Sequence, residues 1–234
     1  MIELDKIYNM DCLDGLRQIE SGSVSLVIAD PPYELQQHNG AGAFGRANRD
    51  YHQGIDHLQT GISNEVLSEM LRVCKHPNMY IFCSKDQLPQ LLTFALDNKL
   101  SYDLLTWHKT NPVPTCNNKY LSDTEYIVFM RKGANLYGSY ETKRKYFITQ
   151  TNTADKKAWG HPTPKPVPII KTLVENSSQE GDIVLDPFMG SGTTAIACIK
   201  ERRHFIGFEL SKEYYQRSLK RIEAEKSQLT LDFK

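Results

Sequence analysis

The sequence predicts an α/β fold built around a mainly parallel sheet, and two observations support this class. Short apolar runs of strand length alternate with segments whose apolar residues recur at helical spacing along most of the 234 residues. One of the runs, near residue 185, passes through a glycine-rich turn into a helical segment, as strands do in βα units. Since 40% of the residues are hydrophobic, the chain has enough apolar side chains for one large core.

Each element is predicted from its period and its boundaries. Seven short apolar segments bounded by polar or turn residues are predicted strands: Lys6 to Met10, Val24 to Ala29, Met79 to Cys83, Tyr102 to Trp107, Glu125 to Met130, Ile183 to Leu185 and Phe205 to Phe208. Helical spacing, a cap or a proline in the first turn predicts helices over Cys12 to Ile19, Ser63 to Lys75, Asp86 to Asn98, Pro166 to Asn176, Thr193 to Arg203 and Lys212 to Lys226. Two long segments without a period, Glu34 to Thr60 and Gly133 to Gly160, are predicted to be functional loops.

Composition excludes several classes of protein. No apolar run approaches the ~20 residues of a membrane span, and the acidic N-terminus has no apolar stretch behind it, so we expect a cytoplasmic protein without a secretory signal. The five cysteines are scattered and odd in number, with no Cys-x-x-Cys. This pattern argues against a disulfide framework or a structural zinc, and no metal is predicted.

Charge is balanced overall, with 28 basic and 28 acidic side chains, but it is unevenly distributed. Residues 131–171 carry nine basic and two acidic side chains, and the basic ones are interleaved with aromatics between Gly133 and Gly160. Cations that meet phosphates and aromatics that stack on bases are typical of a nucleic-acid surface. A solvated basic hairpin whose aromatics pack on the body is the alternative.

The glycine-rich turn predicts a nucleotide-like cofactor. The turn Gly190-Ser191-Gly192 joins the strand that ends at Asp186 to the helix that begins at Thr193, and Glu209 follows the next strand, where it can bind ribose hydroxyls. An ordinary strand-to-helix turn is the alternative reading.

The order of the chain indicates which kind of cofactor this is. Only one helix follows Glu209, so we expect the N-terminal strand to complete this half of the sheet in a circularly permuted order, with Asp11 beside Asp186 and Glu209. Three carboxylates at one sheet edge suit ribose hydroxyls, an amino group and a positive charge, and they do not suit a pyrophosphate. A sulfonium nucleoside is therefore favoured over a dinucleotide.

A second motif follows the strand Val24 to Ala29. In Asp30-Pro31-Pro32-Tyr33, the two prolines stiffen the turn and remove backbone donors, which leaves the Asp30 carboxylate and the Pro31 carbonyl as acceptors beside an aromatic ring. A flat amine can donate both of its hydrogens there while its ring stacks on Tyr33, as expected for a nucleobase extruded from a duplex. A rigid strand-end turn with a capping aspartate is the alternative.

At these residues the sequence resembles the amino-group DNA methyltransferases that use S-adenosylmethionine, in the permuted β group. Three motifs carry the resemblance: Asp30 to Tyr33 resembles the catalytic tetrapeptide, Asp186 to Thr194 the cofactor loop, and His161-Pro162-Thr163-Pro164-Lys165-Pro166 the segment before the methionine-binding helix. Asn9-x-Asp11-Cys12 and Trp107-x-Lys109-x-Asn111-Pro112 are weaker similarities. The family implies a Rossmann-like, seven-stranded, mainly parallel sheet with one antiparallel strand.

The resemblance also implies roles for individual residues. Asp11 would meet the cofactor adenine, Glu209 its ribose, Asp186 and the glycine turn its methionine end, and Lys165 with its neighbours the carboxylate. The predicted cofactor site comprises Asp11, Cys12, His161, Thr163, Lys165, Asp186, Phe188, Gly190, Ser191, Gly192, Thr193 and Glu209. The catalytic residues would be Asp30, Pro31, Pro32 and Tyr33. An aspartate in the first position favours N6 of adenine over N4 of cytosine, by analogy with the family.

The chain is expected to divide into a catalytic half (residues 1–132), a small basic target-recognition segment (133–160), a cofactor half (161–227) and a tail (228–234). DNA contacts are predicted for Arg46, Arg49, Lys109, Lys143, Arg144, Lys145, Lys156 and Lys157. The loop 34–60 would be mobile and close over the flipped base, and a disordered surface loop is the alternative. The tail Gln228 to Phe233 resembles the short peptide that docks on the bacterial sliding clamp, although a helical tail folding back is also possible. The family further suggests a homodimer.

Other functions stay open at this point. N4-cytosine methylation uses the same motifs. A nicotinamide-dependent oxidoreductase is allowed by the glycine turn but leaves Asp30 to Tyr33 and the basic segment unexplained. A catalytically inactive DNA-binding relative is the third alternative.

Overall fold

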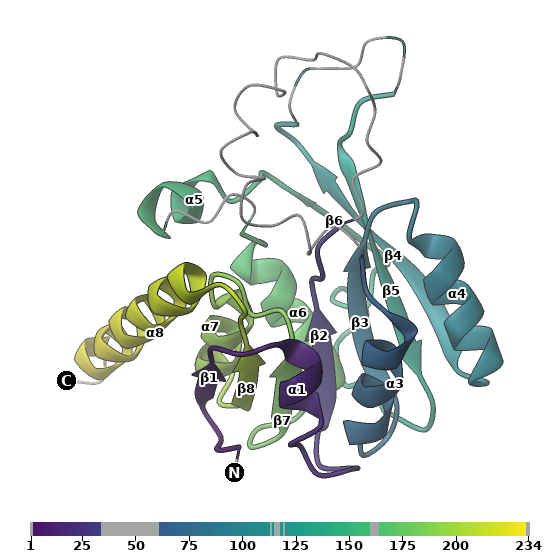
Figure 1. Cartoon of the computed structure of the whole chain (residues 1–234). Coiled ribbons are helices and arrows are strands. Elements are labelled where there is room, and N and C mark those ends of the chain that lie inside the picture. The colour runs from purple at the N-terminus through teal and green to yellow at the C-terminus, as the bar shows by residue number, and fades with distance from the viewer. Residues whose placement is uncertain are drawn as a thin grey trace.

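An eight-stranded sheet forms the centre of the molecule (Figure 1). The computed structural model describes residues 2–33, 61–112, 114, 118, 120–159 and 164–232. In chain order the strands are β1 (Lys6–Tyr8), β2 (Leu26–Ala29), β3 (Asn78–Cys83), β4 (Ser101–Lys109), β5 (Thr124–Arg131), β6 (Tyr146–Thr149), β7 (Ile183–Asp186) and β8 (His204–Phe208). Their spatial order is β1-β8-β7-β2-β3-β5-β4-β6. Among these eight strands of the described residues, β5 alone runs antiparallel to its neighbours, as the resemblance implied.

The N-terminal strand lies beside the last strand of the chain. β1 pairs in parallel with β8, with Lys6 opposite Ile206 and Tyr8 opposite Phe208. β8 pairs with β7, and β7 with β2. The prediction that the N-terminal strand completes the cofactor half is therefore confirmed.

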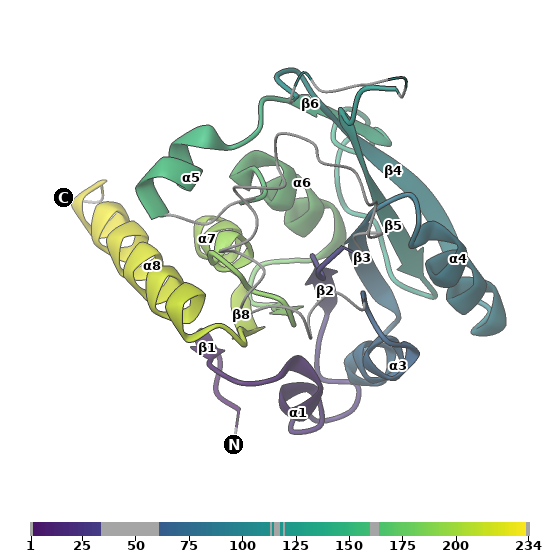
Figure 2. The same ribbon diagram turned by 45° about the horizontal axis from the view of Figure 1, so that its top comes forward.

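Helices cover both faces of the sheet (Figure 2). One face carries α1 (Cys12–Leu16), α3 (Asn64–Val73) and α4 (Leu88–Asp97), and the other carries α6 (Val167–Ser177) and α7 (Thr193–Lys200). The long C-terminal helix α8 (Lys212–Asp232) packs beside α7 and near β1, and α5 (Thr153–Trp159) contacts α8. Among the described residues, no helix is both long enough and apolar enough to cross a membrane.

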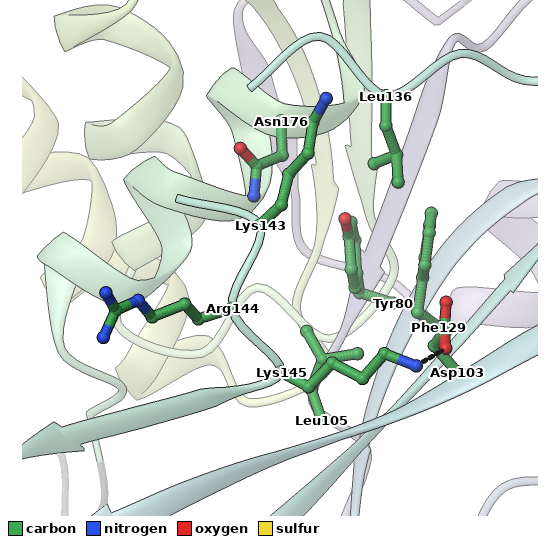
Figure 3. A pocket seen from close by; sticks show the side chains of 9 residues that line it. All are labelled: Tyr80, Asp103, Leu105, Phe129, Leu136, Lys143, Arg144, Lys145 and Asn176. Carbon is green, nitrogen blue, oxygen red and sulfur yellow. Dashed lines mark hydrogen bonds and ion pairs between the residues drawn. The ribbon is translucent and has the colours of Figure 1, made fainter. Parts of the chain in front are cut away.

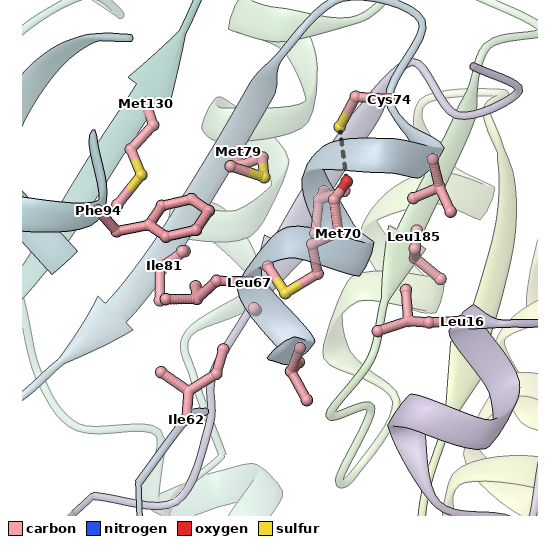
Figure 4. Packing of buried hydrophobic residues seen from close by; sticks show 14 of the residues in the cluster. Leu16, Ile62, Leu67, Met70, Cys74, Met79, Ile81, Phe94, Met130 and Leu185 are labelled. Atoms are coloured by element: carbon pink, nitrogen blue, oxygen red, sulfur yellow. Dashed lines mark hydrogen bonds between the residues drawn. The ribbon is translucent and has the colours of Figure 1, made fainter. Parts of the chain in front are cut away.

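Two hydrophobic clusters lie on opposite faces of the sheet, and successive side chains of a strand belong to one cluster and then the other. Val27 and Ala29 of β2 face the cluster beneath α1, α3 and α4, whereas Leu26 and Ile28 face the cluster beneath α6 and α7. Figure 4 shows the first cluster, where side chains of α3 and α4 pack toward β3 and β5. Because both faces are covered, the central strands β2 and β3 are buried along their whole length.

The segment 133–160, predicted to be an irregular loop, contains two regular elements. It forms β6, which pairs with β4 at the edge of the sheet, and the helix α5. β6 has only four residues, and Tyr146, Phe147 and Ile148 are consecutive apolar residues, so the segment is too short to show the apolar–polar alternation of a strand. The eighth strand is thus an addition to the predicted seven.

The C-terminal helix is longer than its apolar spacing predicts. α8 continues through Asp232, so the backbone of most of the predicted tail is helical. The other helices end within a few residues of their predicted boundaries.

Candidate active site

Four carboxylates line one edge of the sheet. Asp11 follows β1, Glu209 follows β8, Asp186 ends β7 and Asp30 follows β2, and these four strands are adjacent and parallel. Their carboxyl ends therefore meet at the same edge, where open α/β sheets bind ligands. The predicted proximity of Asp11, Asp186 and Glu209 along this edge is confirmed.

The turn between β7 and α7 depends on two glycines in left-handed conformations. Gly190 has φ +51° and Gly192, which precedes the first turn of α7, has φ +81°. The backbone N–H of Gly190 donates to Oε2 of Glu209 (2.8 Å), and the N–H of Ser211 donates to Oε1 (2.7 Å). Glu209 thus connects the end of β8 to the glycine turn.

Asp186 is buried beneath this turn. Its carboxylate accepts hydrogen bonds from the backbone N–H of Phe188 (2.9 Å) and the hydroxyl of Thr194 (2.5 Å). Burial raises the pKa of Asp186 to about 7, although these two donors oppose the rise and the charges of Asp30 and Glu209 add to it. Its protonation therefore changes near neutral pH in the ligand-free protein.

Arg221 of α8, which was not among the predicted site residues, donates hydrogen bonds to the glycine turn. The side chain is buried, and Nη1 donates to the carbonyl of Ser191 (3.1 Å), the Ser191 hydroxyl (3.2 Å) and the Thr193 hydroxyl (3.1 Å). No local motif marks this arginine, because its position near the turn depends on how α8 packs against α7.

Asp11 and Cys12 stand at the beginning of α1. The Asp11 carboxylate caps the helix by accepting from the N–H of Leu13 (2.8 Å). Burial raises the pKa of the Cys12 thiol to about 12, so this cysteine is a neutral thiol at physiological pH. A role for Cys12 as a nucleophile is therefore disfavoured.

The tetrapeptide Asp30 to Tyr33 continues from the end of β2. The Tyr33 hydroxyl donates to Glu125 Oε2 (2.8 Å), and the carbonyl of Pro32 accepts from the side-chain amide of Gln87 (3.3 Å). Gln87 is buried and also accepts from the backbone N–H of Ser84 (3.0 Å), so it joins the segments that follow β2 and β3. Like Arg221, Gln87 is a supporting residue of the site that no sequence motif marks.

Charges alternate in a buried cluster next to this tetrapeptide. Lys165 Nζ lies 2.8 Å from Asp30 Oδ2 and 3.2 Å from Glu125 Oε2, and Lys109 Nζ lies 2.7 Å from Glu125 Oε1. We call Asp30, Lys165, Glu125 and Lys109 the charge cluster. Glu125 reaches it because β5 runs antiparallel, so that its first residues lie at the edge where β2, β3 and β4 end.

The cluster determines the ionisation of its members. Burial alone would raise the pKa of Glu125, but Lys165, Lys109 and the Tyr33 hydroxyl lower it to about 2. Burial raises the pKa of Asp30, although Lys165 acts against this rise. Burial alone would lower the pKa of Lys165, and the two carboxylates raise it above its usual value instead. Lys165 is thus an ammonium held between two carboxylates.

The predicted DNA-binding lysines lie in different surroundings. Lys109 is largely buried in the charge cluster, and Lys157 is exposed on α5. Around a small pocket, Lys143 extends beside Asn176 and Lys145 pairs with Asp103 (Figure 3). Arg144 pairs with Glu141. We call Lys143, Arg144 and Lys145 the basic tripeptide. Lys143 lies near Asn176 at the C-terminal end of α6, whereas Lys165, which contacts Asp30, precedes the N-terminal end of this helix. The basic tripeptide and Asp30 therefore lie toward opposite ends of α6.

Several predicted site residues lie outside the described residues. These are Arg46, Arg49, His161 and Thr163, together with the side chain of Lys156. The predicted mobile loop 34–60 lies there as well. Their roles stay predictions.

The carboxylate acceptors at the sheet edge fit S-adenosylmethionine. Carboxylates at the ends of β1, β8 and β7 match ribose hydroxyls, an exocyclic amine and a sulfonium, and the turn before α7 lets a ligand approach the backbone closely. A mainly parallel α/β sheet with this acidic edge, next to the tetrapeptide Asp30 to Tyr33, is typical of a nucleotide-dependent group transferase.

The family is shown by comparison with known proteins. Residues 24–220 match the model of the N6/N4 methyltransferase family described as "DNA methylase". The chain belongs to this family and is an S-adenosylmethionine-dependent DNA methyltransferase. A curated relative is the type II methyltransferase M2.DpnII of Streptococcus pneumoniae, with 29% identity over 94% of this chain and 90% of the relative.

Solved structures share the fold. The complex of M1.HpyAVI with SAM has a TM-score of 0.67 and 26% identity, over 93% of this chain and 98% of that one. The PvuII DNA methyltransferase, described as cytosine-N4-specific, has a TM-score of 0.70 and 18% identity over 94% of this chain and 86% of that one. At that identity, the second likeness shows the fold alone.

Proposed function

We propose that the protein transfers a methyl group from S-adenosylmethionine to N6 of an adenine extruded from DNA. The observation that carries the proposal is the Asp30 carboxylate, which stands next to the acidic cofactor edge at the end of β2. An extruded base in front of Tyr33 would bring its amine between Asp30 and the cofactor.

Each part of the cofactor has a proposed partner at the sheet edge. Asp11 would accept from the adenine amine, Glu209 from the ribose hydroxyls, and the glycine turn would hold the methionine end. Ser191 and Thr193, which Arg221 holds in place, form part of this turn. The remaining predicted contacts, including Cys12, Phe188, His161 and Thr163, follow from the family resemblance.

The proposed mechanism is direct in-line transfer without a covalent enzyme intermediate. When bound, S-adenosylmethionine supplies an electrophilic methyl group on a sulfonium. The Asp30 carboxylate and the Pro31 carbonyl accept the two hydrogens of the amine and thereby orient the nitrogen lone pair. As positive charge develops on the nitrogen, the anionic Asp30 stabilises it and is placed to take the proton that the nitrogen loses.

Adenine is favoured over cytosine by the aspartate that opens the tetrapeptide. The comparison with PvuII DNA methyltransferase supports the capacity of this fold for N4 chemistry as well. The test is to incubate the protein with S-adenosylmethionine and DNA, digest the product and identify nucleosides by mass spectrometry. N6-methyl-2′-deoxyadenosine is expected, and N4-methyl-2′-deoxycytidine alone would overturn the base assignment.

Replacement of Asp30 by alanine tests the catalytic assignment. We expect Asp30→Ala to abolish turnover while the dissociation constant for the cofactor stays close to that of the wild type. The exposed Asp97→Ala on α4 is the matched control and should retain activity. Unimpaired methylation by the Asp30 variant would refute the assignment.

The wider biological setting is proposed from relatives. Type II methyltransferases such as M2.DpnII and M2.MboI suggest a cytoplasmic bacterial enzyme of a restriction-modification system, with a small target-recognition segment at 133–160. A homodimer is proposed from the family resemblance and is tested by light scattering.

Docking of the tail on a sliding clamp is a separate proposal. Deletion of residues 228–234 should abolish clamp co-purification but leave methylation of free oligonucleotides intact. Loss of folding would instead support a tail that belongs to α8.

A further inference from the structure

Lys165 contacts Asp30, the proposed catalytic aspartate, whereas the resemblance implies that Lys165 contacts the carboxylate of the cofactor. Its ammonium lies 2.8 Å from Asp30 Oδ2 and is almost completely buried, with a side-chain exposure of 7%. It also lies 5.1 Å from the ring centroid of Tyr33 and 5.3 Å from that of Phe82. Two carboxylates and two aromatic faces therefore surround one ammonium.

We infer that Lys165, anchored by Glu125, is a positioning residue for methyl transfer that keeps Asp30 anionic and leaves Oδ1 to accept a hydrogen from the target amine. This inference rests on the proposed role of Asp30. Glu125 is the second positioning residue, because it binds Lys165, Lys109 and the Tyr33 hydroxyl at the same time.

The ionisation of Asp30 matters for the chemistry of the amine. An ionised carboxylate is only an acceptor, whereas a protonated one presents an O–H donor that would compete for the nitrogen lone pair. A buried carboxyl tends toward the neutral form, and Asp30 is surrounded mostly by low-dielectric protein. A fixed cation next to Oδ2 counteracts this tendency without using the space in front of the amine.

The groups that face Asp30 come from five elements and its own loop. They are Tyr33, Cys83 at the end of β3, Lys109 at the end of β4, Glu125 in β5, Lys165 before α6 and Asp186 at the end of β7. Lys165 is the cation among them that touches Asp30 directly, whereas the anion of Glu125 raises the pKa of Asp30. Removal of Lys165 and removal of Glu125 should therefore change the pKa of Asp30 in opposite directions.

Two substitutions test the inference through the pH dependence of kcat at saturating cofactor and DNA. Lys165→Met should move the acid limb of the profile to higher pH by about one to three units, as expected for loss of an adjacent opposite charge. Glu125→Gln should move it to lower pH while decreasing the plateau, because Lys165 and Lys109 lose their shared partner. Lys165→Arg, which keeps the charge, should stay near the wild-type profile. Lys171→Met is the matched control, because Lys171 is a half-buried lysine of α6 that pairs with Glu175 and Glu201 instead of Asp30.

A second measurement does not depend on turnover. With 13C-labelled aspartate carboxyls, the Asp30 signal, assigned through Asp30→Asn, should titrate at higher pH in cofactor-free Lys165→Met than in the wild type. This readout also separates the two proposals, because a failure to methylate adenine would leave the Asp30 titration testable. If Lys165→Met does not fold, as judged by circular dichroism, Glu125→Gln and its opposite shift still test the inference.

Two results would overturn it. If Lys165→Met raises the cofactor dissociation constant while the pH profile and the Asp30 titration stay unchanged, Lys165 serves the cofactor carboxylate instead. If Lys165→Met and Glu125→Gln move the acid limb in the same direction, the cluster has a merely structural role.

Discussion

Asp30 and Asp186 are carboxyl groups at the same sheet edge, but their surroundings give them different partners. Asp30 is bound by the ammonium of Lys165, whereas Asp186 is bound by a backbone N–H and a hydroxyl, both neutral donors. A full opposite charge stabilises a carboxylate more than neutral donors do. Burial raises the pKa of both carboxyls, but only Asp30 has an adjacent ammonium that opposes the rise, whereas Asp186 has neutral donors and its pKa rises to about 7.

The raised pKa of Asp186 predicts a pH dependence of stability. Its pKa changes from 3.8 to about 7 on folding, so between these values the folded state retains a proton that the unfolded state has lost. The free energy of unfolding of the cofactor-free protein should therefore fall as pH rises through this window. Asp186→Asn should flatten this fall, as measured by urea denaturation across the window.

The exposed Asp97→Asn is the control and should keep the wild-type slope. Glu125 contributes between its folded pKa of about 2 and its unfolded value of 4.5, mostly below this window. Burial also raises the pKa of Asp30 and Glu209, so these two carboxyls add a fall of the same sign, and the effect of Asp186 is read from the difference between the variant and the wild type. An identical slope in the Asp186 variant would contradict the assigned shift.

At the scale of elements, close packing of short elements determines the shape of the cofactor edge. α1 has only five residues and approaches β8 closely because Gly15 has no side chain. A Cβ at Gly15 would lie 2.5–2.6 Å from three ring carbons of Phe208, which is completely buried. Since Asp11 precedes α1 and Glu209 follows β8, this contact determines how far apart the two carboxylates stand.

Gly15→Ala should destabilise the protein, although alanine is the better helix former. The overpacking against Phe208 costs about 1–3 kcal/mol, more than the ~1 kcal/mol gained in helix propensity. Denaturation midpoints are the measurement, and the double variant Gly15→Ala/Phe208→Leu should lose less than the sum of the two single changes. A stabilised Gly15→Ala protein would show that α1 can move away from β8.

At the scale of the whole molecule, the formal net charge is zero, but the acidic and basic side chains lie in separate regions. The acidic edge is the proposed cofactor site, and the segment 131–171 carries the excess positive charge. The tertiary structure separates these charges. Lys165 lies in the buried charge cluster with Lys109, which comes from outside the segment, whereas Arg144 and Lys145 pair with carboxylates near the surface.

Neutralising the basic tripeptide tests the DNA surface. The triple variant Lys143→Ala/Arg144→Ala/Lys145→Ala should weaken DNA binding and flatten its dependence on salt concentration, because fewer counterions are released. Lys145→Ala alone should have a smaller effect, since Lys145 is already paired with Asp103. Fluorescence anisotropy across a salt series is the measurement, and an unchanged slope in the triple variant would assign the phosphate contacts to other parts of the chain.

The sequence by itself determined the α/β class, the permuted order and the two motifs. These features are local: periodicity follows from which faces of a strand or helix are buried, and the turns at Gly192 and Pro31 depend on the backbone chemistry of glycine and proline. The strand β6 was not predicted, because its four residues are too few to show an alternation of apolar and polar side chains.

Only the tertiary structure decided which distant side chains complete the site. Glu125 joins Asp30 because an antiparallel strand brings its first residues to the catalytic edge, and Arg221 joins the glycine turn because α8 packs beside α7. Lys165 was predicted as a site residue from its motif, yet its contact with Asp30 appears only in the folded chain. Such contacts depend on packing between elements far apart in the sequence, and therefore no local pattern of residues encodes them.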